Sequence, residues 1–201
     1  IKLAYLPQPG MVRLRLTSFG RTAQENKVLV DNEIQKLKQL IPSLIFGFDN
    51  DKLESVIGSL LKEKALSIST AESCTGGYIA HLITSVAGSS SYYSGSVISY
   101  SNSIKEKSLG VSSEMLARHG AVSKEVVTAM AVGVRELMDT DYSLATSGIA
   151  GPAGGTPEKP VGTVWIALAS DKGVISRKFL FGEHRERNIR KAALSALICC
   201  V

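Results

Sequence analysis

The segment TAESCTGGYIA, residues 70–80, gathers side chains that could do chemistry in this 201-residue chain. An acid, a hydroxyl, a thiol and a second hydroxyl follow an apolar run, and two glycines then lead into a helical pattern. A side chain at a strand-to-helix turn lies beside the first N–H groups of the helix, which lack intrahelical partners and stand at the positive end of its dipole. Two interpretations of Ser73 stay open: a nucleophile beside an oxyanion hole, or a helix cap.

A catalytic serine needs a base, and none of the three histidines is an obvious one. The segment ISYSNSIKEK instead offers Tyr100 and Lys105, at and just past the end of the next expected strand. A neutral lysine amine can deprotonate serine. Lowering a lysine pKa from about 10.4 to about 7 costs ~4–5 kcal/mol, which burial and a nearby positive group can supply. The alternative is that Lys105 is only a solvated charge.

Two neighbours of Ser73 give rival interpretations. Cys74 could attack as a thiolate, but a catalytic cysteine normally has a histidine beside it, so a packing or pocket-lining role is favoured. Glu72 could act as a general base, although a carboxylate at this position is expected to bind local backbone N–H groups.

A second polar loop, SGIAGPAGGTPEKPVGT, begins at Ser147. Its glycines allow close backbone approach to a ligand such as a phosphate, or they make a long turn. It is not a P-loop, because no Lys-Ser/Thr pair follows the glycines. Arg185, Arg187 and Arg190 begin the last expected helix and could bind a phosphate or form its solvated face. The solvated face is favoured for Arg185.

The elements that must position these residues are expected from residue 50 onward. Helical patterns alternate with strand patterns, and a hairpin of VGTVWIALAS and GVISRKFLF precedes the final helix. This order predicts a three-layer α/β/α sheet, mostly parallel with an antiparallel edge hairpin. Ligands of such sheets bind beyond the carboxyl ends of the strands, where both polar loops would open.

Residues 1–49 are expected to form a separate small α+β unit. MVRLRLTSFG alternates as a strand does, residues 25–44 have helical spacing ended by Pro42, and LIFGF at 44–48 is strand-like. A unit of this size is near the limit for independent folding. Because the chain starts without Met or a signal pattern, it is interpreted as a fragment of a longer protein.

The bulk composition narrows the class of protein. With 44% apolar and 20% charged residues, the chain is expected to be globular, and no apolar run reaches the roughly 20 residues of a membrane helix. Three cysteines predict no disulfide framework, which favours a cytoplasmic setting, and no metal site is expected. The net charge of +5 is scattered, so it suits an anionic small molecule better than a nucleic-acid surface.

Four motifs, AESCTGG, SGSVISYSNSIKEKSLGV, SGIAGPAGGTPEKPVGTVWIA and FGEHRERNIRKAAL, resemble the C-terminal domain of the CinA (competence/damage-inducible) family over residues 50–201. Family members include nicotinamide mononucleotide amidohydrolases. The segments before residue 50 resemble the small KH-type middle domain of full-length CinA proteins, although they show no G-x-x-G loop, so nucleic-acid binding is not expected.

The resemblance implies roles for individual residues. Ser73 would be the nucleophile, and Tyr100 and Lys105 would complete the catalytic group. An arginine near the last helix would bind the phosphate, with Arg187 as the first choice. Further substrate contacts are expected from Glu72, Cys74, Thr75, Gly76, Gly77, Ser147, Gly148 and Gly151.

The resemblance also implies deamidation of nicotinamide mononucleotide to nicotinic acid mononucleotide and ammonia, without metal or organic cofactor. A homodimer or larger homo-oligomer is expected by analogy. The alternative is a non-catalytic nucleotide-binding or assembly module, in which the same residues bind a ligand without turnover.

Overall fold

The computed structural model describes residues 1–20 and 22–200. The chain forms two compact units, Ile1–Asn50 and Asp51–Val201. No helix in the described part of the chain is long and apolar enough to cross a membrane.

The first unit is a hairpin followed by a helix. Strands β1 (Lys2–Gln8) and β2 (Met11–Thr17) pair antiparallel, and α1 (Ala23–Leu40) begins with a capping box in which Thr22 and Glu25 bond each other's backbone N–H. The prediction of a strand at residues 44–48 is wrong. The short 3-10 helix η1 (Pro42–Leu44) ends at Leu44, residues 45–48 adopt no regular secondary structure, and the described two-stranded sheet consists of β1 and β2.

The second unit alternates helices and strands as the sequence predicts. Its elements are α2 (Leu53–Glu63), β3 (Ile68–Glu72), α3 (Tyr78–Thr84), η2 (Ser89–Ser91), β4 (Tyr93–Ile98), α4 (Asn102–Leu109), α5 (Ser113–His119), α6 (Lys124–Met138), β5 (Tyr142–Gly148), β6 (Thr163–Ser170), β7 (Gly173–Leu180) and α7 (Arg185–Ile198).

The five strands form one mixed sheet in the order β4-β3-β5-β6-β7. β4, β3 and β5 run parallel, whereas β6 pairs antiparallel with both β5 and β7. The expected edge hairpin is present. The expectation of a mostly parallel sheet is too strong, because the hairpin joins the sheet through β6 and makes half of the four pairings antiparallel.

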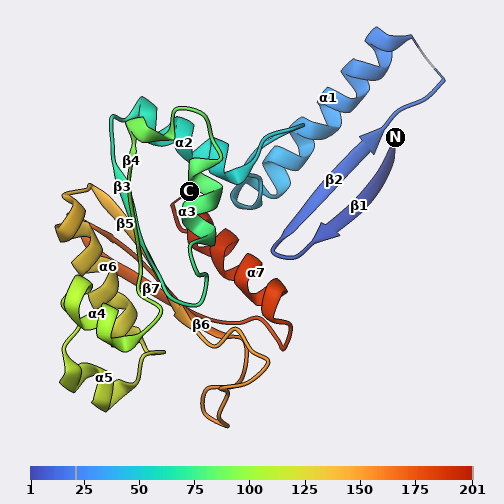
Figure 1. Ribbon diagram of the computed structural model, residues 1–201. Coiled ribbons are helices and arrows are strands. Elements are labelled where there is room, and N and C mark those ends of the chain that lie inside the picture. Colours follow the sequence, from blue (N-terminus) through green and yellow to red (C-terminus); the bar gives the residue numbers. More distant parts are fainter. Residues whose placement is uncertain (21, 201) are drawn as a thin grey trace. The chain divides into compact units, whose positions relative to one another are not determined.

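Helices cover both faces of this sheet (Figure 1). α6 packs along one face, against all five strands, with α4 and α5 beside it. α3 and α7 contact strands of the sheet on the other face, and α2 packs against both of these helices. The side chains of β3 alternate accordingly: Ser69 bonds the Val134 carbonyl of α6, whereas Glu72 bonds backbone N–H groups of α3.

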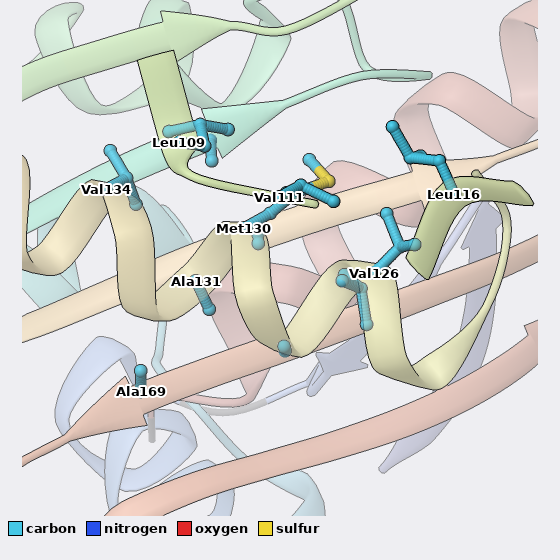
Figure 2. Close-up of a cluster of buried hydrophobic side chains, with 12 residues drawn as sticks. Leu109, Val111, Leu116, Val126, Met130, Ala131, Val134 and Ala169 are labelled. Atoms are coloured by element: carbon cyan, nitrogen blue, oxygen red, sulfur yellow. The ribbon is translucent and has the colours of Figure 1, made fainter. Parts of the chain in front are cut away.

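Buried apolar side chains under α6 fix the position of α4 against α6 (Figure 2). Leu109 from the end of α4 lies among Met130, Ala131 and Val134 of α6, all buried. Gly133 of α6 has no side chain, and a Cβ there would collide with the Leu109 carbonyl. Close packing of α6 against α4 thus fixes the helix that carries Lys105.

Candidate active site

A pocket of about 190 Å³ opens beyond the carboxyl ends of the parallel strands. Three strand ends contribute to it: Ser73 follows β3, Tyr100 follows β4, and Ser147 lies near the end of β5. Its lining consists of Ser73, Cys74, Tyr100, Asn102, Lys105, Ala121, Val122, Ser147, Gly148, Ala150 and Arg185.

Ser73 and Lys105 meet at the floor of this pocket. The Lys105 Nζ lies 3.2 Å from the Ser73 Oγ, 2.6 Å from the Ser99 carbonyl oxygen and 3.4 Å from the Tyr100 carbonyl oxygen. Lys105 projects from α4, which Ser101 caps, and only 1% of it is exposed. A lysine so deeply buried is not the solvated charge that the sequence left as an alternative.

These three partners fit both charge states of the amine. A neutral amine can donate its two N–H groups to the carbonyls of Ser99 and Tyr100, and its lone pair then faces the Ser73 hydroxyl. A charged amine can donate to all three oxygens. Burial lowers the pKa of Lys105 below its ordinary value of 10.5 and so favours the neutral state.

Cys74 lines the pocket but is not suited to attack. Burial raises the pKa of its thiol to about 12, so the thiol keeps its proton at neutral pH. The thiolate is the nucleophilic form of cysteine. The pocket-lining role expected for Cys74 fits this environment.

Glu72 is fully buried and holds the start of α3. Its Oε2 accepts from the N–H groups of Gly77 and Ile79, each at 3.0 Å, and its Oε1 accepts from Ala80 at 2.8 Å. Both carboxylate oxygens therefore point at the helix, and Glu72 is absent from the pocket lining. In this structure Glu72 holds the first N–H groups of α3, as the sequence analysis favoured, and its expected contact with substrate stays a prediction.

Two backbone N–H groups of the turn remain available. Those of Ser73, Gly76 and Tyr78 donate to backbone carbonyls. By contrast, those of Cys74 and Thr75 donate to no oxygen of another residue in the described part of the chain. These two groups are candidate oxyanion donors next to Ser73; Cys74 lines the pocket, whereas Thr75 lies directly behind that lining.

Other residues of the ESCTGG turn support its shape without lining the pocket. The Thr75 hydroxyl lies 2.8 Å from the Thr146 hydroxyl on β5. Gly76 and Gly77 adopt φ values of +61° and +95°, which residues with side chains rarely adopt. These glycines therefore contribute to the backbone path of the turn, and their expected contact with substrate stays a prediction.

Tyr100 contributes its backbone carbonyl to Lys105, but its side chain points elsewhere. Tyr100 is 64% exposed, and its phenol oxygen lies 3.4 Å from Nη2 of Arg185. The hydroxyl has no hydrogen bond with Ser73 or Lys105 among the described contacts. The structure thus brings Tyr100 to the pocket mouth, not into the proton-transfer pair.

The arginine at the pocket is Arg185 and not Arg187. Arg185 donates from Nη1 to the Gly151 carbonyl at 2.8 Å and reaches the pocket wall. Arg187 is exposed and lies outside the lining, because two residues along a helix turn the side chain by about 200°. The sequence analysis named Arg185 but favoured a solvated face for it, because nothing in the pattern fixed the rotation of α7.

The second polar loop forms the opposite wall. Ser147 is buried and lines the pocket. Its hydroxyl donates to the Ala121 carbonyl at 2.7 Å and so joins the loop to that part of the wall. Gly148 also lines it and leaves room for Val164, which a Cβ would approach to 2.7 Å. Gly151 is not in the lining and acts through its bond to Arg185.

The pocket also includes four residues that the sequence analysis did not single out: Asn102, Ala121, Val122 and Ala150. Asn102 begins α4 in the motif that carries Lys105, and that position could have suggested it. No cluster of three or more His, Cys, Asp or Glu suited to a metal occurs within residues 1–20 and 22–200.

The fold and the site define the class: an α/β protein with a buried serine–lysine pair beyond the ends of its parallel strands. Residues 50–200 match the profile of the CinA C-terminal domain family, and the chain belongs to that family. The match does not include residues 1–49, so their KH-type assignment stays a prediction.

Relatives of known sequence support this assignment. A CinA-like protein of Cytophaga hutchinsonii is 49% identical over 195 residues, which cover 97% of this chain and 47% of that protein. A CinA-like protein of Flavobacterium psychrophilum is 49% identical over 198 residues, covering 98% and 47%. The chain thus spans about half the length of these relatives.

Solved structures share the fold of the second unit. The competence/damage inducible protein CihA of Agrobacterium tumefaciens has a TM-score of 0.72 at 37% identity, covering 76% of this chain and 94% of that one. The competence damage-inducible protein A (ComA) of Klebsiella pneumoniae has a TM-score of 0.71 at 34% identity, covering 73% and 91%.

Proposed function

We propose that this chain hydrolyses the carboxamide of nicotinamide mononucleotide to nicotinic acid mononucleotide and ammonia. The observation that carries the proposal is the 3.2 Å approach of a buried lysine amine, whose pKa burial lowers, to the Ser73 hydroxyl. The family resemblance supplies the substrate.

The first half-reaction forms an acyl-enzyme. Lys105, in its neutral form, takes the Ser73 proton as Oγ attacks the carboxamide carbon. The N–H groups of Cys74 and Thr75 bind the oxygen that becomes negatively charged in the tetrahedral intermediate. When the C–N bond breaks, the proton on Lys105 passes to the leaving nitrogen, which departs as ammonia.

The second half-reaction restores the enzyme. Lys105, neutral again, takes a proton from water as the water oxygen attacks the ester carbon. The tetrahedral intermediate collapses, the C–Oγ bond breaks, and Ser73 recovers its proton from Lys105. The remaining proton of the attacking water leaves the product acid for solvent, where ammonia can take it up, so that the product is the carboxylate and no oxidant, reductant or cofactor enters the balance.

The size of the pocket suggests how the substrate lies. About 190 Å³ is smaller than the roughly 300–1,000 Å³ of pockets that enclose a drug-sized ligand, so the pocket fits the pyridine ring and its carboxamide. The ribose and phosphate would extend outward past Arg185. Two of its five N–H donors face Gly151 and Tyr100, which leaves donors for a phosphate.

The main test is ammonia release from nicotinamide mononucleotide. Ser73→Ala is expected to lower kcat by at least about 10³-fold, as removal of a nucleophile does. Ser85→Ala, an exposed serine at the end of α3, is the matched control and should keep full activity. Equal turnover by the Ser73 variant and its control would end the proposal.

A non-catalytic nucleotide-binding or assembly module remains the second candidate. It predicts that the unaltered chain binds the mononucleotide in calorimetry and releases no ammonia. The lowered pKa of Lys105 favours the enzyme, because a binding site for an anionic nucleotide gains from a charged lysine rather than a neutral one. The proposal has three further parts. Residues 1–49 form a KH-type domain, the protein is cytoplasmic, and it is a homodimer or larger homo-oligomer.

A further inference from the structure

The first turn of α7 is joined to the SGIAGP loop by two side chains three residues apart. Arg185 donates to the Gly151 carbonyl at 2.8 Å, and Asn188 Nδ2 donates to the Ala150 carbonyl at 3.0 Å. Residues three apart lie on the same side of a helix. One helical turn therefore binds two consecutive peptide units of the loop.

Asn188 also bonds the segment that leads into α7. The same Nδ2 donates to the Gly182 carbonyl at 2.7 Å, so both amide hydrogens are used. Only 1% of Asn188 is exposed, so its amide is shielded from solvent. An apolar side chain of the same shape would leave the Ala150 carbonyl, which is buried, and the Gly182 carbonyl, which is partly buried, without this donor.

The hydrogen bonds of Asn188 and Arg185 hold the part of the pocket wall that is expected to contact the substrate. Ala150 and Arg185 both line it, and Arg185 is the candidate phosphate ligand. Ser73 and Lys105 belong to the β3–α3 turn and to α4, and neither has a hydrogen bond to Asn188. Asn188 is therefore connected to the binding wall and not to the reacting pair.

We propose that Asn188 is a positioning residue, which holds Ala150 of the pocket wall and Arg185 at the correct distance from the Ser73–Lys105 pair and thereby sets substrate affinity. This role rests on the proposed amidase function. It differs from a general structural role because it acts on substrate affinity and leaves the chemical step unchanged.

The test is steady-state kinetics of Asn188→Leu with nicotinamide mononucleotide. KM is expected to rise about tenfold or more while kcat stays within about threefold, because binding is lost and the reacting pair is intact. Leu197→Met, a buried volume-conserving change on the same helix, is the matched control and should alter neither constant. Asn188→Ser retains one hydrogen-bond donor and should raise KM less. If the leucine variant does not fold, the same kinetic comparison is made with the serine variant.

Amide hydrogen exchange of the ligand-free protein gives a second readout. Residues 149–155 should exchange faster in Asn188→Leu than in the control. A fall in kcat at unchanged KM, or unchanged exchange in this loop, would overturn the positioning role.

Failure of the proposed function would look different. If the unaltered chain binds the mononucleotide without releasing ammonia, the amidase fails, and the ratio of dissociation constants replaces the KM ratio as the test of Asn188. If the chain neither binds nor turns over the mononucleotide, both proposals are overturned.

Discussion

At the scale of single residues, the charge of Lys105 decides whether the site can react. Burial is the main cause that lowers the pKa of Lys105, and a negatively charged Cys74 thiolate would raise it. Because burial also raises the pKa of Cys74 to about 12, this opposition is absent near neutral pH. Desolvation is thus left to favour the neutral amine.

The position of the Tyr100 side chain gives a prediction at this scale. Tyr100→Phe should keep kcat within about fivefold, because the phenol lies near Arg185 and the backbone carbonyl that Lys105 uses is unchanged. A role in proton transfer would instead predict a loss of about 10²–10⁴. Turnover of the purified variant, compared with that of Tyr5→Phe in the first unit, separates the two.

Part of the site could be predicted from local sequence. Ser73 follows an apolar strand and precedes two glycines, and Lys105 follows the next strand, so topology alone places both at one edge of the sheet. The choice between Arg185 and Arg187 could not be predicted, because it depends on how α7 is rotated against the loop. The direction of the Tyr100 phenol likewise depends on a contact 85 residues away.

At the scale of elements, the β3–α3 turn depends on Glu72. One side chain satisfies three of the N–H groups at the start of α3, which would otherwise be left without partners inside the protein. The turn that presents Ser73 and the candidate oxyanion donors lies between this carboxylate and the helix.

Glu72→Gln tests this dependence. Glutamine has one acceptor oxygen in place of two, so at least one buried N–H loses its partner, and the free energy of unfolding should fall by about 1–3 kcal/mol. Glu63→Gln, at an exposed position on α2, should change it by less than about 0.5 kcal/mol. Urea denaturation measures both, and equal values for the two variants would contradict the capping role.

The element-scale errors have a common cause. The strand expected at residues 44–48 and the mostly parallel sheet were inferred from local patterns, but a strand needs a partner, and pairing is decided between distant segments. β1 was not predicted for another reason. Its side chains are largely exposed, so its sequence shows little of the apolar alternation that indicates a strand. The helix of the first unit, whose end was inferred from the local signal of Pro42, ends at Leu40 and so close to the expected position.

At the scale of the whole molecule, the two units differ in how they are built. α1 has no buried residue, and the hairpin strands carry none either, whereas the second unit contains a large buried core. Every residue that lines the candidate pocket belongs to the second unit.

A truncated chain tests whether the second unit is sufficient. Residues 51–201 are expected to fold alone and to keep ammonia release within about threefold of the whole chain, since a domain with its own core can fold independently. Thermal unfolding and turnover of the two chains provide the comparison. A truncated chain that folds but has lost turnover would show that the first unit contributes to the reaction.

The most direct test of the central claim is the titration of Lys105 itself. In protein labelled with ¹⁵N-lysine, the Nζ resonance that disappears in Lys105→Met can be followed against pH by NMR. Because burial disfavours the charged amine, the midpoint should lie clearly below 10.5, and kcat/KM should rise with pH along the same curve. A Lys105 that titrates at or above 10.5, in a chain that still releases ammonia at neutral pH, would contradict the account.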